Sequence, residues 1–103
     1  MPKDLSVVLL LDYYGALLPE KQRDLVEYYY CDDLSLAEIA DNEDITRQGA
    51  RDSIVRAVNK LREFESALKF VEKSQQSKIL SKNYKETRSD EDLLKLIQYI
   101  DEM

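Results

Sequence analysis

The chain has 103 residues, enough for one small domain with a short extension; 44% of them are hydrophobic and 35% are charged. Two glycines and two prolines are too few for the turns of an all-β fold, and no apolar run approaches the roughly 20 residues of a membrane-spanning helix. The net charge of −6 also argues against a surface that is basic throughout, as dedicated nucleic-acid binders usually have. We therefore expect an all-α protein that does not insert into membranes.

The residue types needed for most catalytic and metal sites are missing. Histidine is absent, which removes the commonest general base and most zinc or iron sites, and Cys31 is the single cysteine. The acidic stretch 41–44 does not fit a calcium loop, because Ile45 stands where the fifth EF-hand position would supply a ligand. We expect no enzymatic activity, no cofactor and no metal. A lone cysteine with no signal peptide favours the cytoplasm.

Two helices are predicted in the first third of the chain. Apolar residues at helical spacing predict a helix over residues 5–14, with Gly15 as its stop. Pro19 suits the first position of a second helix, which should run to about Tyr30. Leu25 and Val26 are expected on its buried side.

Capping residues mark the next two helices. Ser35 and Glu38 have the spacing of a capping box, so a short helix is predicted from Leu36 to about residue 41. After a polar turn, Thr46 is predicted to be the N-cap of a long helix that ends between residues 74 and 80. Its apolar residues keep a heptad rhythm and form one predicted dimer or core stripe: Ile54, Ala57, Leu61, Phe64, Leu68 and Val71.

The last quarter of the chain is predicted to be a linker followed by an amphipathic helix. Residues 75–88 are mostly polar, and Ser89 then caps a helix with an apolar stripe of Leu93, Leu96, Ile97 and Ile100. We therefore divide the chain into a domain of residues 1–74 and a linker with C-terminal helix, residues 75–103. The heptad stripe is expected to be buried in a homodimer, or else to be covered by this final helix in a monomer.

Residues 35–62 have the layout of a helix-turn-helix. A short capped helix is followed by a tight turn and a second helix whose first residues are polar. Ala40 would allow the two helices to approach closely, Ile45 would plug the turn, and Ala50 and Ile54 would face inward. An ordinary helical hairpin is the alternative interpretation of this pattern.

The charge distribution favours DNA contact by this second helix. Residues 1–45 have a net charge of −8 and residues 64–103 of −1, whereas residues 46–63 have +3. Arg pairs with guanine edges and Gln with adenine, while a helix start suits a phosphate. The alternative is that these side chains only solvate the helix. The candidate DNA-binding residues are Ser35, Thr46, Arg47, Gln48, Arg51 and Arg56.

The order of these motifs resembles a known family. Leu-Pro-Glu-Lys-Gln-Arg at residues 18–23 and Leu-Ser-Leu-Ala-Glu-Ile-Ala at residues 34–40 are similar to region 4 of sigma-70-type bacterial sigma factors. The Asp-Tyr-Tyr of residues 12–14, the Tyr-Tyr-Tyr of residues 28–30 and the Arg-Gln of residues 47–48 resemble the YlxM family more closely. The resemblance covers about residues 5–70.

The resemblance implies a helix-turn-helix DNA-binding regulator associated with the signal recognition particle pathway. Its implied partners are double-stranded DNA and components of that pathway. The alternative is a non-catalytic accessory module that docks on a protein or RNA of the pathway. Three residues depart from the family pattern: Glu43 in place of a buried Phe, Asp44 at a turn position that favours positive φ, and Gly49 inside the recognition helix. They would suit a helix-turn-helix kept as a scaffold after its DNA-reading role weakened.

Overall fold

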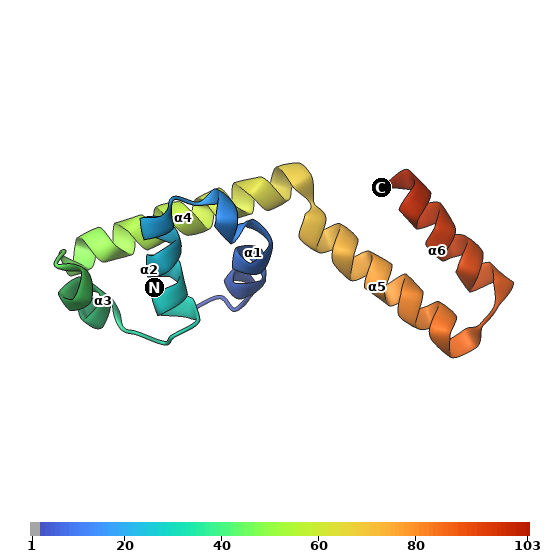
Figure 1. Cartoon of the computed structure of the whole chain (residues 1–103), viewed down its shortest axis with the longest axis horizontal. Helices are drawn as coiled ribbons and strands as arrows, with labels where there is room; N and C mark the ends of the chain where they lie inside the picture. Colours follow the sequence, from blue (N-terminus) through green and yellow to red (C-terminus); the bar gives the residue numbers. More distant parts are fainter. Residues whose placement is uncertain (1–2) are drawn as a thin grey trace. The chain divides into compact units, whose positions relative to one another are not determined.

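The computed structural model describes residues 3–103, and in these residues it contains α-helices, one short 3₁₀ helix and no strand (Figure 1). The all-α fold predicted from the sequence is confirmed. The chain divides into two compact units, an N-terminal unit of residues 1–68 and a C-terminal hairpin of residues 69–103. No helix among residues 3–103 is both long and apolar enough to cross a membrane. The elements are α1 (Ser6–Tyr14), η1 (Gly15–Leu17), α2 (Glu20–Tyr30), α3 (Leu36–Glu43), α4 (Arg47–Leu68), α5 (Phe70–Thr87) and α6 (Asp90–Glu102).

The long helix α4 is the central helix of the N-terminal unit, and α1, α2 and α3 all pack along it (Figure 1). This packing follows from one apolar face of α4, on which residues three and four positions apart point the same way. The core is apolar: no polar or charged side chain is buried among the described residues. The largest fully buried side chains come from all four helices: Val7, Tyr14, Val26, Ile39, Ile54 and Leu61.

Polar contacts fasten the start of the chain to this core. The Tyr14 hydroxyl donates to the Glu65 carboxylate, and the rings of Tyr14 and Phe64 lie 6.0 Å apart between centroids. The Asp4 carboxylate accepts from the Arg62 guanidinium at 3.2 Å, and from the Ser6 amide at 3.0 Å at the start of α1. Together these contacts connect α1 with the second half of α4.

Several helix ends agree with the sequence prediction. The Ser35 hydroxyl accepts from the Glu38 amide at 3.1 Å, and the Glu38 carboxylate accepts from the Ser35 amide at 3.2 Å, so the predicted capping box is confirmed. Helix α1 ends at Tyr14, next to Gly15 as predicted. Helix α2 begins one residue later than predicted, with Pro19 as its N-cap.

The prediction that the long helix continues to residues 74–80 is wrong. Helix α4 ends at Leu68, and Lys69 adopts a left-handed conformation with φ of 56°. The heptad rhythm continues across this break, which is why the apolar pattern alone did not reveal it. The linker predicted over residues 75–88 is also wrong, because these residues lie mainly in α5. The boundary between the two compact units therefore lies between Leu68 and Lys69 in the chain, whereas the predicted boundary lay after residue 74.

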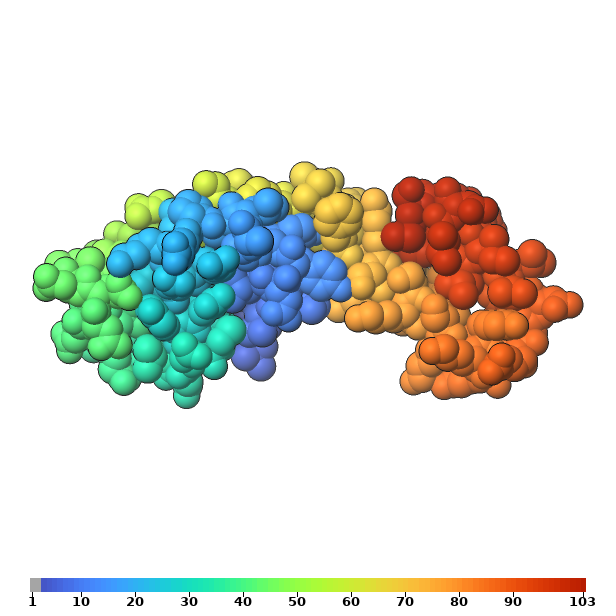
Figure 2. Space-filling view, in the orientation of Figure 1, coloured from blue at the N-terminus to red at the C-terminus, as the bar shows by residue number. Residues whose placement is uncertain are grey.

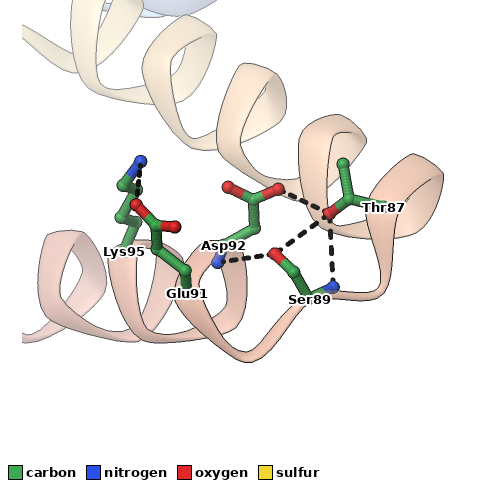
Figure 3. Close-up of polar contacts among 5 residues, drawn as sticks. All are labelled: Thr87, Ser89, Glu91, Asp92 and Lys95. Atoms are coloured by element: carbon green, nitrogen blue, oxygen red, sulfur yellow. Dashed lines mark hydrogen bonds and ion pairs between the residues drawn. The ribbon is translucent and has the colours of Figure 1, made fainter.

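The C-terminal hairpin consists of α5 and α6, which pack against each other (Figure 1). A network of hydroxyl and carboxylate groups holds the turn between them (Figure 3). The Ser89 hydroxyl accepts from the Asp92 amide at 3.1 Å, as predicted, and the Thr87 hydroxyl contacts the Asp92 carboxylate. Arg88 ends α5 in a left-handed conformation, with its amide donating to the Tyr84 carbonyl at 2.7 Å.

Candidate nucleic-acid interface

The helix-turn-helix predicted for residues 35–62 is formed by α3, the turn after it and the first half of α4. Ala40, Ala50 and Ile54 are buried where α3 packs on α4, as the sequence spacing predicts. The Thr46 hydroxyl accepts from the Gly49 amide at 2.9 Å and so caps the start of α4. Figure 2 shows α3 and the beginning of α4, coloured green, at one end of the N-terminal unit.

The turn between the two helices differs from the prediction in its plug residue. Ile45 was expected to fill the turn, but its side chain is 40% exposed. Glu43 takes the interior position instead: its side chain is only 14% exposed, and its carboxylate lies 2.7 Å from the Lys21 ammonium of α2. The Glu43 carboxylate raises the pKa of Lys21. The turn has therefore repacked around an ion pair that connects α2 with the end of α3.

The other two departures from the family pattern also have a local structural account. Asp44 adopts φ of 55° and ψ of 46°, and the amides of Asp44 and Ile45 both donate to the Ala40 carbonyl. This is the left-handed residue with which helices commonly end. A Cβ atom added at Gly49 would lie 3.0 Å from the Thr46 hydroxyl oxygen. Glycine at this position therefore leaves room for the N-cap of α4.

The first two turns of α4 carry Arg47, Gln48 and Arg51 with exposed side chains. Two of them are engaged by Asp52. The Gln48 amide donates to the Asp52 carboxylate at 2.8 Å, and the Arg51 guanidinium lies 3.6 Å from the same oxygen. The Asp52 side chain is itself 46% exposed, so a negative charge lies among the three polar side chains that point outward here.

Arg56 does not join this group. At 100° per residue it lies far round the helix from Arg51. It lines a pocket between α2 and α4, with a volume of 290 Å³, together with Gln22, Asn59, Lys60 and Glu63. The side-chain oxygen of Gln22, Oε1, is buried and has no hydrogen-bond partner in the described structure. Four of the basic residues of α4 thus form two separate groups, one at the helix start and one beside α2, while Arg62 pairs with Asp4.

Ser35 is placed at a helix start, as predicted, but that position already faces an anionic group. The Glu38 carboxylate accepts from the Ser35 amide, and the Ser35 hydroxyl is used by the Glu38 amide. A phosphate here would meet the Glu38 carboxylate as a like charge.

The predicted stripe does not form one continuous surface. Ile54 and Leu61 are fully buried in the N-terminal unit, and Phe64 is half-buried beside Tyr14. Leu68 is 38% exposed at the end of α4, whereas Val71 belongs to α5, beyond the break at Lys69. The core alternative therefore holds for Ile54 and Leu61, and the six residues do not offer one continuous stripe to a second copy. Ile54 and Leu61 are buried within the N-terminal unit itself, where α1, α2 and α3 pack along α4.

Comparison with known proteins identifies the family. A family model described as UPF0122, "Putative helix-turn-helix protein, YlxM / p13 like", matches residues 1–101. The chain belongs to this family. The YlxM/p13-like chain is 48% identical over 73 residues to a UPF0122 protein of Shouchella clausii, covering 71% of this chain and 67% of that protein.

Two further relatives match over most of their length. Identity is 41% over 105 aligned positions to a UPF0122 protein of Thermoanaerobacter sp. strain X514, covering 93% of this chain and 88% of that protein. It is 42% over 93 residues to a UPF0122 protein of Malacoplasma penetrans, covering 88% and 86%. The predicted membership of the YlxM family is confirmed, and with it the helix-turn-helix fold.

Sequence reasoning missed three residues that shape this interface. Asp52 stands four positions after Gln48, the spacing of a helical side-chain pair, so the contact was open to prediction. Lys60 follows Arg56 by four positions and could have been found in the same way. The Lys21 partner of Glu43 is distant in sequence and left no local signal.

Proposed function

We propose that this YlxM/p13-like protein is a non-catalytic, cytoplasmic regulator that binds double-stranded DNA through the start of α4. The observation that carries the proposal is the exposure of Arg47, Gln48 and Arg51 on the first two turns of the second helix of a helix-turn-helix. In this motif the second helix enters the major groove and its N-terminal residues contact base edges. These residues also lie in a segment, residues 46–63, with a net charge of +3, whereas the N-terminal unit as a whole is acidic.

The two basic groups of α4 suit two kinds of contact. Arg47 and Arg51 can each pair with the O6 and N7 atoms of guanine, and Gln48 with the N6 and N7 atoms of adenine. We propose that Arg56 and Lys60, which line the pocket beside α2, contact backbone phosphates, which fix the register of a protein on DNA without reading sequence. Thr46 acts through its cap, which orients the first turn of α4.

The acidic surroundings make this a weak and selective binder. The N-terminal unit has 8 basic and 14 acidic side chains, so the protein gains little long-range attraction to DNA. Because few basic side chains are available, each protomer neutralises about three phosphates. The logarithm of the DNA-binding constant should then fall with the logarithm of the salt concentration with a slope of about −3. Affinity then depends mainly on the base contacts of α4.

The resemblance to the YlxM family supports two further parts of the proposal. It connects the regulator with the signal recognition particle pathway, whose genes or components are the proposed targets. A two-fold homodimer would present two recognition helices to two half-sites of a duplex. We propose both the connection to this pathway and the homodimer for this chain.

Duplex binding, measured by fluorescence anisotropy at several salt concentrations, tests the proposal. Arg51→Ala should weaken binding by about 1–3 kcal/mol on a preferred sequence and less on unrelated sequences if Arg51 reads a base. A uniform loss with a slope reduced by about one would make it a phosphate contact. Lys82→Ala, which removes one positive charge from α5, is the matched control and should leave binding unchanged.

A second candidate is a docking module for a protein or RNA of the same pathway. It is favoured by Asp52, whose carboxylate engages Gln48 and Arg51 and would face the phosphates of a bound duplex. If the folded protein shows no duplex binding even at low salt, where electrostatic attraction is strongest, the DNA proposal is wrong and the docking function takes its place.

A further inference from the structure

The C-terminal hairpin leaves about half of its apolar residues exposed. Helix α6 has no buried residue, although α5 packs along it. Leu93, Leu96 and Tyr99 are half-buried, and the Tyr99 hydroxyl donates to the Lys73 carbonyl at 3.3 Å. The apolar residues that remain exposed are Leu94 at 65%, Ile97 at 46% and Ile100 at 53% on α6, Met103 at 57% just after α6, and Phe70 at 51% and Ile79 at 53% on α5.

This exposure is not the fraying of a poorly formed end. The turn of the hairpin is held by the Ser89 cap and by contacts of Thr87 with Ser89 and Asp92 (Figure 3). The Lys95 ammonium lies 3.3 Å from the Glu91 carboxylate on the next turn of α6. Two helices of this length are too small to enclose a core alone. A hairpin with a fixed turn and an open apolar stripe therefore has the form of half a helical bundle.

The charges of the hairpin are separated between its two helices. Its seven basic and seven acidic side chains cancel, so all of the net charge of −6 lies in the N-terminal unit. Helix α5 is basic and α6 is acidic. The charged residues are Lys73, Lys78, Lys82 and Lys85 against Glu72 and Glu86 on α5, and Asp90, Glu91, Asp92, Asp101 and Glu102 against Lys95 on α6.

We infer that the C-terminal hairpin is a self-association surface, and that its occupant is the hairpin of a second copy of this chain. A two-fold pairing uses the same surface on both copies and can place the acidic α6 of each against the basic α5 of the other. The apolar stripe from Leu94 to Ile100 is then covered in both copies. The contacting hairpins are each neutral, so pairing through them brings no net like charge together at the interface, whereas each N-terminal unit carries −6.

The oligomeric state of the full chain tests this inference. Sedimentation at micromolar concentration should give a species of twice the 12.1 kDa chain mass. Leu94→Glu and Ile97→Glu should each shift this species to the monomer, with an unchanged helical circular-dichroism spectrum. Leu17→Glu is the matched control: Leu17 is 57% exposed in the N-terminal unit, and its replacement should leave the dimer intact.

A charge exchange tests the identity of the partner. One variant carries Lys78→Glu and Lys85→Glu, which makes α5 acidic, and the other carries Glu91→Lys, Asp101→Lys and Glu102→Lys, which makes α6 basic. Each alone should associate at least tenfold more weakly than the wild type, and an equimolar mixture should recover a 1:1 heterodimer. A wild-type monomer at all concentrations, a dimer that survives Ile97→Glu, or a mixture that stays monomeric would each overturn the inference. Because no readout uses DNA, these outcomes are independent of the proposed duplex binding.

Discussion

Replacing Asp52 with asparagine should strengthen DNA binding by the N-terminal unit. The asparagine carbonyl can still accept from the Gln48 amide, which now donates to Asp52 at 2.8 Å, so the orientation of Gln48 is retained. The change removes only the negative charge that lies 3.6 Å from the Arg51 guanidinium. Two unit charges 4 Å apart in water interact by about 1 kcal/mol, so the dissociation constant should fall about fivefold. The salt slope should steepen by about 0.9 per protomer.

Fluorescence anisotropy with one labelled duplex, measured across a salt series, supplies both quantities. The control is Asp12→Asn, which removes the same charge from an exposed position on α1. If the two variants gain equally, only net charge matters and Asp52 has no special role. An unchanged affinity for Asp52→Asn would refute contact between this part of α4 and DNA. Combining Asp52→Asn with Arg51→Ala in a double-mutant cycle isolates the coupling between the two side chains.

Three predictions concern stability. Asp44→Gly should raise the free energy of unfolding by about 1 kcal/mol, because glycine adopts the left-handed conformation of this residue without steric cost. The expected gain in Tm is about 4–8 °C. An unchanged Tm would show that the Asp44 side chain offsets the steric cost of its left-handed conformation. Ser35→Ala removes one half of the capping box and should cost about 1 kcal/mol in a urea titration, so an unchanged midpoint would mean that the cap contributes nothing. In acid, Asp4 and Asp33 should each lose a stabilising contribution, because hydrogen bonds from Ser6 and Lys3 lower their pKa below the ordinary 3.8. That contribution is present above pH 3.8 and disappears as the pH falls through the lower folded-state pKa, so the Asp4→Asn/Asp33→Asn variant should lose less stability than the wild type over this range.

Local sequence signals predicted the helices and caps of this chain well. Ser35 with Glu38 and Ser89 with Asp92 have short-range spacings whose chemistry requires a helix start, and both caps form. The packing of Ala40 on Ala50 and Ile54 followed from helical periodicity in the same way. These features depend on residues only a few positions apart, which is why one sequence is enough to find them.

The features that escaped prediction depend on conformation or on distant contacts. Lys69 breaks the long helix in a left-handed conformation, which glycine or asparagine would have indicated but lysine does not. The heptad rhythm continues through it into α5, so the apolar pattern indicated one helix where there are two. The Lys21–Glu43 pair connects residues far apart in the sequence, and Glu43, not Ile45, takes the interior position at the turn.

The uneven charge of the N-terminal unit has a consequence for how a DNA reader would search a genome. Sequence-independent binding comes almost entirely from phosphate contacts, and an N-terminal unit with a net charge of −6 and one basic helix makes few of them. Strongly basic regulators are held on bulk DNA, where millions of competing sites lower their free concentration. A DNA reader of this charge would spend most of its time free, so a small number of copies per cell would be enough to keep a target site in exchange with the free protein. Occupancy of that site then follows the concentration of the protein directly, without a genomic reservoir to buffer it.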